Sequence, residues 1–225
     1  MKERGICMTP ANVVAIRERR KTETRRRIKL NIAGPLYLMS SSISPQWGGG
    51  PPGIYFCDSQ DIEETCQHLF VRCPYVPGDL LYIREACWMW GAWCKNGLTK
   101  TGRQRWRFKP RGERVVYERP GVTAKRDGSE GWVYRHARYM PKRMARTWVR
   151  ITDVRVQQVQ ELDNNEALAE GTPDIRTIDN NWDMRDCFGV LWDDIHGPGA
   201  WERNDWVWAL TFSLIEKENL NAKLD

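Results

Sequence analysis

A short segment near the start of the chain, RERRKTETRRRIK at residues 17–29, surrounds two threonine hydroxyls with basic side chains. The segment holds eight of the 35 Lys and Arg residues but only two of the 29 Asp and Glu residues, so 27 of each sign remain elsewhere. A local excess of cations in an otherwise neutral chain is typical of a site for a phosphate-bearing partner. We call residues 17–29 the basic segment.

The basic segment has a second interpretation, in which it is the solvated end of a helix whose arginines bind no partner. A helix lying on a membrane surface is disfavoured, because no broad apolar face with Trp or Phe adjoins the segment. The choice between a phosphate site and a solvated helix end stays open from sequence.

Two ionisable residues are expected in electrostatically unfavourable positions. Lys21 lies among the six arginines of the basic segment, which disfavour its charged form and are expected to lower its pKa. Glu170 is expected at the C-terminal end of a short helix, where the helix dipole disfavours a carboxylate. Each of them could serve structure as a member of an ion pair, or could take part in chemistry.

The composition describes a folded globular chain. Its 225 residues, 41% of them hydrophobic and 12 of them Trp, are enough for one domain with insertions or for two small domains. No apolar run approaches the roughly 18 residues of a membrane span, and MKERGICMTP lacks the apolar stretch of a secretory signal. We therefore expect a cytoplasmic protein without membrane contact.

The seven cysteines are expected to be reduced thiols, because they are odd in number and lack the dense spacing of a disulfide framework. Four residues offer possible zinc ligands, namely Cys57, Cys66, His68 and Cys73. Their spacing is irregular and contains no Cys-x-x-Cys pair, so we predict no metal and no cofactor.

The first half of the chain predicts a strand, a helix and a second strand. A strand at residues 5–8 precedes a helix that begins at Thr9-Pro10, with Thr as the N-cap, and runs to about Arg20. On this helix Arg17, Arg20, Lys21 and Thr24 would continue one face at spacings of three and four residues. LLYI at residues 80–83 predicts a strand buried on both faces.

The second half of the chain predicts a bulged strand, two helices and a last strand. TWVRITDVRVQQVQEL changes its apolar parity near Thr152-Asp153, which indicates a β-bulge. Asp163 to Glu166 has the form of a capping box, and Gly171 with Pro173 would end that helix. A helix at residues 184–195 and the strand NDWVWALTF follow.

The resulting fold class is α+β, with one domain over residues 1–225 built around a small curved sheet or barrel. Two insertions interrupt it, a loop at residues 31–72 and a segment rich in Trp and Arg at residues 88–135, with a hairpin near residues 114–117. Residues 216–225 form a polar tail.

The tryptophans divide into two groups. Those on apolar faces, which are Trp148, Trp192, Trp206 and Trp208, are expected in the core. Those in segments rich in Gly and Arg, which are Trp88, Trp90, Trp93 and Trp106, could stack on unpaired bases, although packing within the protein is the more common role.

Several of these fragments resemble one family. RRKTETRRR after the first helix resembles the Gly/Arg-Arg-Lys-Thr-x-Thr-x-Arg signature of the ASCH domain family, a branch of the PUA-like β-barrels. CPYVPGDLLYIRE, YMPKRMARTWVRITDVRVQQVQEL, EALAEG and NDWVWALTF resemble, in this order, ASCH-like proteins carried by bacteriophages and prophages. The resemblance covers about half of the chain and leaves out both insertions.

The resemblance implies a PUA-like barrel with flanking helices and a cleft that receives RNA or a nucleobase. Some family members are amidohydrolases that remove the acetyl group of N4-acetylcytidine, and another is a ribonuclease. Their catalytic residues correspond to Lys21, Thr24 and Glu170 of this chain. Lys21 would act as the base toward the Thr24 hydroxyl, and Glu170 would orient Lys21 or protonate the leaving amine.

Further polar residues are candidates for binding nucleic acid. Arg17, Arg20, Arg25 and Arg26 belong to the basic segment. Arg84 and Glu85 lie at a predicted strand end, where they could form a framework salt bridge or line a site. Arg143 and Arg146 could extend the basic surface or simply be solvated.

Three classes of function stay open from sequence. The first is a hydrolase acting on an acylated base or on RNA, and the second is a non-catalytic reader that holds RNA or a modified nucleoside in the same cleft. The third is a phage interaction protein that engages a host factor through the insertions. The basic segment favours the first two classes.

Overall fold

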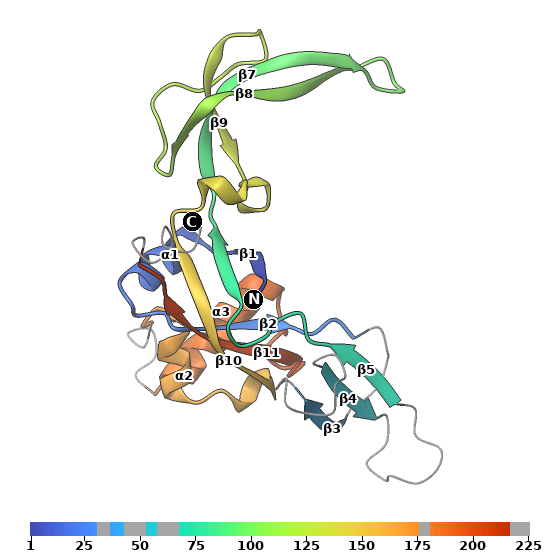
Figure 1. Ribbon diagram of the computed structural model, residues 1–225, viewed down its shortest axis with the longest axis vertical. Helices are drawn as coiled ribbons and strands as arrows, with labels where there is room; N and C mark the ends of the chain where they lie inside the picture. Colours follow the sequence, from blue (N-terminus) through green and yellow to red (C-terminus); the bar gives the residue numbers. More distant parts are fainter. Residues whose placement is uncertain (31–36, 43–52, 58–67, 176–180, 217–225) are drawn as a thin grey trace. The chain divides into compact units, whose positions relative to one another are not determined.

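The computed structural model of the chain describes residues 1–30, 37–42, 53–57, 68–175 and 181–216 (Figure 1). The chain divides into two compact units. Unit 1 contains Met1–Glu3, Ala15–Leu80 and Val149–Asp225, and unit 2 contains Arg4–Val14 and Leu81–Trp148. Each unit is described by itself below.

The architecture is mixed α+β, with more strand than helix and with three α-helices in the described residues. In unit 1, β10 (Trp148–Gln158) and β2 (Glu23–Arg27) flank β11 (Trp206–Leu214), whereas β1 (Glu3–Cys7) and β6 (Leu80–Arg84) are neighbouring strands that lie mostly in unit 2. No closed barrel is found among the described residues, so the small barrel stays a prediction. The expected strand at residues 80–83 is confirmed, with Leu81 and Ile83 fully buried.

Within unit 1, β10 and β11 form the long antiparallel pair that the sequence predicts. Their register shifts between Ile151 and Asp153, which confirms the expected β-bulge. On the other side of β11, β2 pairs antiparallel with it from Val207 opposite Arg27 to Thr211 opposite Glu23. The second half of the basic segment is therefore a sheet strand.

The first helix, α1, spans Pro10–Arg17 and ends about three residues earlier than expected. Its predicted N-cap is confirmed, since the Thr9 hydroxyl accepts a hydrogen bond from the Asn12 N–H at 3.2 Å. Arg19 then takes a positive φ of 60°, which stops the helix. The predicted helical face through Lys21 and Thr24 is therefore wrong, because the chain continues as an extended strand.

Helix α2, Asn164–Ala169, begins at the capping box expected from sequence. The Asp163 carboxylate accepts a hydrogen bond from the Glu166 N–H at 2.7 Å, and Glu170 is the C-cap residue. Helix α3, Met184–His196, has a similar box at Asp183 and confirms the second predicted helix. A 3-10 turn at Val159–Glu161 precedes α2.

The two helices bury an apolar cluster beneath β11. It includes Trp192, as expected, and consists of Val159, Leu162, Ala167, Met184, Phe188, Trp192, Ala200 and Val207. Trp148 and Trp208 are also buried, and Trp206 is half-buried.

The segment expected as a loop at residues 31–72 contains strands. β3 (Tyr37–Ser42), β4 (Gly53–Cys57) and β5 (His68–Arg72) form an antiparallel sheet with β4 in the middle. Ile54 and Phe56 of β4 are fully buried. The loop prediction is wrong for these three strands, since apolar residues at alternate positions of β4 give this sheet a buried face.

Unit 2 contains a second three-stranded sheet. β7 (Cys87–Leu98) pairs with β8 (Gln104–Val116) on one side and with β9 (Glu130–Arg135) on the other. The β7–β8 turn falls at residues 99–103, where the Gly102 N–H donates to the Thr99 carbonyl at 2.9 Å and Gly102 has a φ of 77°. The hairpin predicted near residues 114–117 is therefore misplaced, because the glycine that permits the turn is Gly102. Two short 3-10 turns, Ala137–Tyr139 and Lys142–Met144, follow β9.

The cap of α2 supports the position of Glu170 and gives a first prediction. Asp163→Ala removes the acceptor of the Glu166 N–H and should lower the free energy of unfolding by about 1 kcal/mol. Asn165→Ala, an exposed change in the same helix, should leave it unchanged or raise it by a few tenths of a kcal/mol, because Ala has the higher helix propensity. Urea denaturation of both variants checks this expectation, and equal effects would contradict a capping role.

Candidate functional site

Lys21 and Glu170 meet in the interior of unit 1. The Lys21 ammonium donates to Glu170 Oε2 at 2.5 Å and to the Glu170 backbone carbonyl at 2.6 Å. Lys21 is 2% exposed and Glu170 5% exposed. Two members of the trio implied by the family resemblance are therefore in direct contact.

The backbone positions this pair. The Thr22 N–H donates to the Ala169 carbonyl at 2.8 Å, which holds the start of β2 against the end of α2. Gly171 follows Glu170 with a φ of 70°, and a Cβ atom there would lie 3.1 Å from the Lys21 Cβ. The positive φ favours glycine at this turn, and a side chain there would also crowd the lysine stem.

Arg25 is the second cation of the site, and its side chain is completely buried. Its guanidinium contacts three carboxylates, at 3.2 Å from Glu170, 2.7 Å from Glu166 and 3.4 Å from Glu23. It also lies 5.9 Å from the centre of the Phe188 ring. We predicted Arg25 as a nucleic-acid ligand, but in the structure internal carboxylates occupy its Nη1 and Nη2 donors.

A third cation, Arg155 on β10, completes the cluster. Its guanidinium lies 2.8 Å from Glu23 and 2.7 Å from Glu166, and the Thr211 hydroxyl donates to Glu23 at 3.0 Å. Arg155 is 40% exposed and marks the solvent side of the cluster. We define the ion network as Lys21, Arg25, Arg155, Glu23, Glu166 and Glu170, in which three positive charges balance three negative ones.

The environment of Lys21 changes its acidity. Burial lowers the pKa of Lys21, the contact with Glu170 opposes that shift, and Arg26 and Arg25 add smaller lowering contributions. The predicted direction is confirmed. Its main cause is desolvation rather than the neighbouring arginines, because the folded chain directs most of those arginines elsewhere.

Thr24 is buried in the middle of β2, opposite Leu210 of β11. Side chains alternate between the two faces of a strand, so Thr24 lies on the face of β2 opposite Glu23 and Arg25. Glu23 and Arg25 belong to the ion network. Strand β2 therefore separates the Thr24 side chain from those of Glu23 and Arg25.

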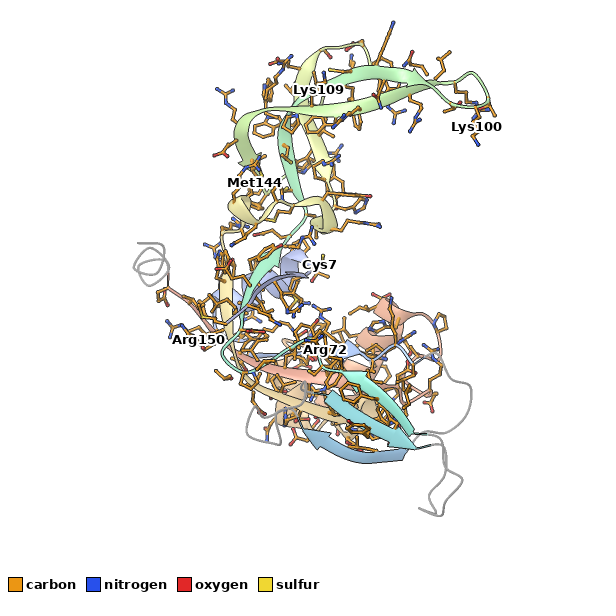
Figure 2. All side chains as sticks on the ribbon, turned by 45° about the vertical axis from the view of Figure 1, so that its right-hand side comes forward. Cys7, Arg72, Lys100, Lys109, Met144 and Arg150 are labelled. Carbon is orange, nitrogen blue, oxygen red and sulfur yellow. The ribbon has the colours of Figure 1, made fainter. Side chains whose placement is uncertain are left out.

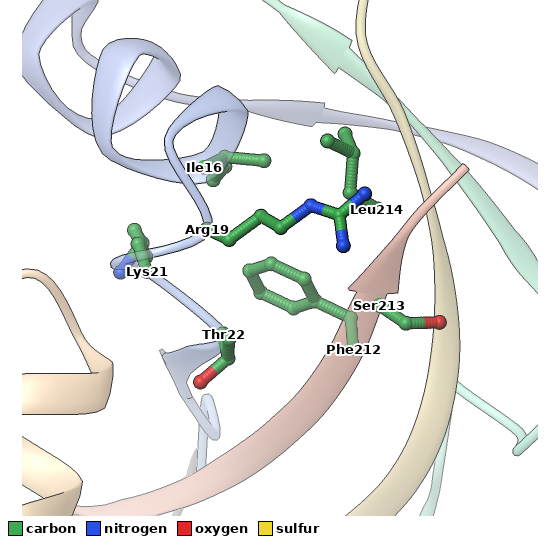
Figure 3. A pocket seen from close by; sticks show the side chains of 7 residues that line it. All are labelled: Ile16, Arg19, Lys21, Thr22, Phe212, Ser213 and Leu214. Carbon is green, nitrogen blue, oxygen red and sulfur yellow. The ribbon is translucent and has the colours of Figure 1, made fainter. Parts of the chain in front are cut away.

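A pocket of about 190 Å³ adjoins Lys21 (Figure 3). Its lining comes from the end of α1, the segment that leads into β2 and the end of β11, and consists of Ile16, Arg19, Lys21, Thr22, Phe212, Ser213 and Leu214. Sequence reasoning missed Arg19, Thr22 and Phe212. Thr22 is the first threonine of the family signature, which is the signal that could have identified it.

The remaining arginines of the basic segment differ in exposure. Arg17 and Arg20 are exposed, and Arg20 forms an ion pair with Glu18 at 2.5 Å. Arg19 is exposed and pairs with Glu216 at 2.5 Å. Arg26 is half-buried. The basic segment therefore combines a buried, neutralised part with a solvent-facing part at the end of α1.

Four predicted binding residues lie in unit 2. Arg146 holds Glu85 through two hydrogen bonds, of 2.9 and 2.8 Å, and lies 3.6 Å from the centre of the Tyr117 ring. Burial, followed by the charge of Glu85, raises the pKa of Tyr117 to about 12. Arg84 donates to the Arg138 carbonyl, and Arg143 pairs with Glu113 at 2.9 Å. Glu85 thus forms a salt bridge with Arg146 rather than with Arg84, and Arg143 lies on the exposed surface.

The cysteine hypothesis falls largely outside the described residues. The structure does not describe Cys66 or the side chains of Cys57 and His68. Cys73 is buried and hydrogen-bonded to the Tyr75 carbonyl at 3.0 Å. In the part of the chain that the structure describes, no group of three or more His, Cys, Asp or Glu side chains is arranged to hold a metal ion.

Comparison with known proteins gives no relative: no protein-family model, no curated protein and no solved structure matches this chain. Among the described helices, none has the length and apolar character needed to cross a membrane. Function must therefore follow from the residues of the site and their geometry.

The ion network gives the second prediction. Arg25→Met leaves buried carboxylates without their shared cation and should lower the free energy of unfolding by about 3–5 kcal/mol. Arg155→Met removes a 40% exposed cation from two of the same carboxylates and should cost about 1 kcal/mol or less. Chemical denaturation of the two variants measures the difference, and a larger loss for Arg155→Met would overturn this account of burial.

Proposed function

We propose that this chain is an ASCH-like protein that binds RNA or a modified nucleoside and hydrolyses an acyl group from an exocyclic base amine. N4-acetylcytidine is the reference substrate. The observation that carries the proposal is a buried Lys21–Glu170 pair, with lowered lysine pKa, in which Lys21 also lines a small pocket beside the first half of the basic segment.

The pocket suits a small planar group. Its volume of about 190 Å³ is below the roughly 300–1,000 Å³ of drug-sized sites, so it favours a single base over a larger ligand. Phe212 offers an apolar ring, and the Thr22 hydroxyl and Arg19 guanidinium offer polar contacts. Arg17 and Arg20 are exposed nearby in sequence and could hold phosphate groups of a polynucleotide.

The proposed chemistry is amide hydrolysis, in which water is added across the C–N bond and acetate and the free amine are released. Burial increases the neutral fraction of Lys21, which lets its amine accept a proton from a threonine hydroxyl or from water. Glu170, hydrogen-bonded to Lys21, would relay that proton to the departing amine. The resemblance assigns the hydroxyl to Thr24, whereas Thr22 lines the pocket, so both residues need testing.

A non-catalytic reader is the second candidate, and one observation favours it. The Lys21 ammonium already has two acceptors on Glu170, and Arg25 shares the same carboxylate. Such a saturated pair can serve structure alone. The ribonuclease and the phage protein that engages a host factor stay as predictions from sequence.

The third prediction concerns turnover. Lys21→Met should reduce kcat/KM on N4-acetylcytidine by at least about 100-fold, the usual size of a lost general base. Arg155→Gln perturbs the same ion network without contacting Lys21 and should retain most of the activity. Mass spectrometry of the released cytidine measures turnover, and thermal melts establish that each variant is folded.

The pH profile and the two threonines sharpen this test. Because the Lys21 pKa is lowered from 10.5, kcat/KM should rise with pH as the amine becomes neutral and level off below pH 10.5. Thr22→Val and Thr24→Val identify the hydroxyl that reacts. Full turnover in Lys21→Met would refute the mechanism, and retained RNA without any product, on N4-acetylcytidine or on bulk RNA, would support the reader instead.

A further inference from the structure

The charge outside the basic segment is unevenly distributed, although its total is zero. Residues 86–112 contain seven basic residues and no acidic residue, namely Lys95, Lys100, Arg103, Arg105, Arg107, Lys109 and Arg111. All seven are exposed. A second concentration of positive charge therefore lies in unit 2, on the β7–β8 hairpin.

The hairpin is a two-stranded ribbon over its outer part. β9 pairs with β7 only as far as Ala92, whereas β8 continues beside β7 to Leu98 opposite Gln104 (Figure 1). Figure 2 shows side chains projecting along this ribbon, with Lys100 at its turn and Lys109 farther along β8. The outer ribbon thus has no third strand beside it in the described residues.

One face of the ribbon is aromatic and internally packed. Trp93 lies opposite Phe108, with 5.7 Å between ring centres, and Trp106 lies opposite Lys95 on the same face. Arg126 lies 5.5 Å from the centre of the Trp93 ring, and Arg135 lies 5.5 Å from that of Phe108. Intramolecular partners therefore occupy the Trp93 and Phe108 rings, which argues against base stacking by Trp93.

The other face carries the cations. Arg105, Arg107 and Lys109 occupy alternate positions of β8, so consecutive charges are about 6.8 Å apart along the strand, and Arg111 follows where the register with β7 shifts. Across the strand pair they face small residues, with Cys94 opposite Arg107 and Ala92 opposite Lys109. We call these four residues the basic face.

The basic face is poorly neutralised. Arg111 pairs with Glu130 at 3.3 Å, but within the described residues no carboxylate forms an ion pair with Arg105, Arg107 or Lys109. A row of like charges on a narrow ribbon is unfavourable through self-repulsion, and a bound polyanion would relieve it.

We propose that the basic face of the β7–β8 ribbon is a binding site for double-stranded DNA, contacted through its phosphates. The charge row complements a polyanion, and a two-stranded β-ribbon fits the major groove of B-form DNA. Single strands usually need exposed aromatic platforms, whereas the rings here lie on the opposite face. The deep, narrow major groove of A-form RNA does not admit such a ribbon. This site is separate from the Lys21 pocket and does not depend on its proposed function.

The test compares two matched double variants by fluorescence anisotropy with a labelled 20-base-pair DNA duplex. Arg107→Gln with Lys109→Gln removes two charges from the basic face and should weaken binding roughly 60-fold in 0.1 M salt. The slope of log K against log salt should fall by about 1.8. Arg119→Gln with Lys125→Gln removes the same two charge types from exposed positions of unit 2 outside the ribbon and should change either quantity little.

The remaining outcomes are distinct. Equal losses of affinity in both double variants would show that net charge alone drives binding and would overturn the site. An unchanged affinity in Arg107→Gln with Lys109→Gln would also overturn it. Tighter binding to duplex RNA, to single-stranded DNA or to anionic lipid vesicles than to duplex DNA would overturn the choice of partner.

Discussion

The buried contact between Lys21 and Glu170 constrains the rest of unit 1. An ammonium inside a protein costs several kcal/mol unless a carboxylate and further acceptors surround it. The carboxylate and carbonyl of Glu170 meet that requirement only if α2 ends at this residue and the chain turns at once. Gly171 permits the turn, and the bond from Thr22 to Ala169 fixes β2 beside it.

The chain uses arginine in two opposite ways. Arg25 is fully buried and neutralised by three carboxylates, so it contributes to the order of unit 1 and has little capacity for an external anion. Arg105 and Arg107 are exposed and have no ion pair within the described residues, so their charge is open to a partner. Burial and the position of the acidic side chains, rather than residue type, separate these roles.

Features encoded by neighbouring residues could be predicted. The caps at Thr9 and Asp163 need partners only three residues away, and the parity change around Thr152 marks the bulge without knowledge of its partner strand. The helix after Pro10 was extended too far because Arg19 adopts a positive φ that its type does not favour. Strands β3, β4 and β5 were not predicted, because they pair with one another and not with any strand that the sequence had identified.

The sequence by itself determined the caps, the bulge, the buried strand at residues 80–83 and the presence of a basic segment, because each depends on short-range periodicity or local hydrogen bonding. Only the tertiary structure decided which basic residues are neutralised. Lys21 and Glu170 are separated by 149 positions, and Arg25 and Glu166 by 141. Charge counts along a chain cannot show such pairings, because Coulomb energies depend on distance in space and on burial.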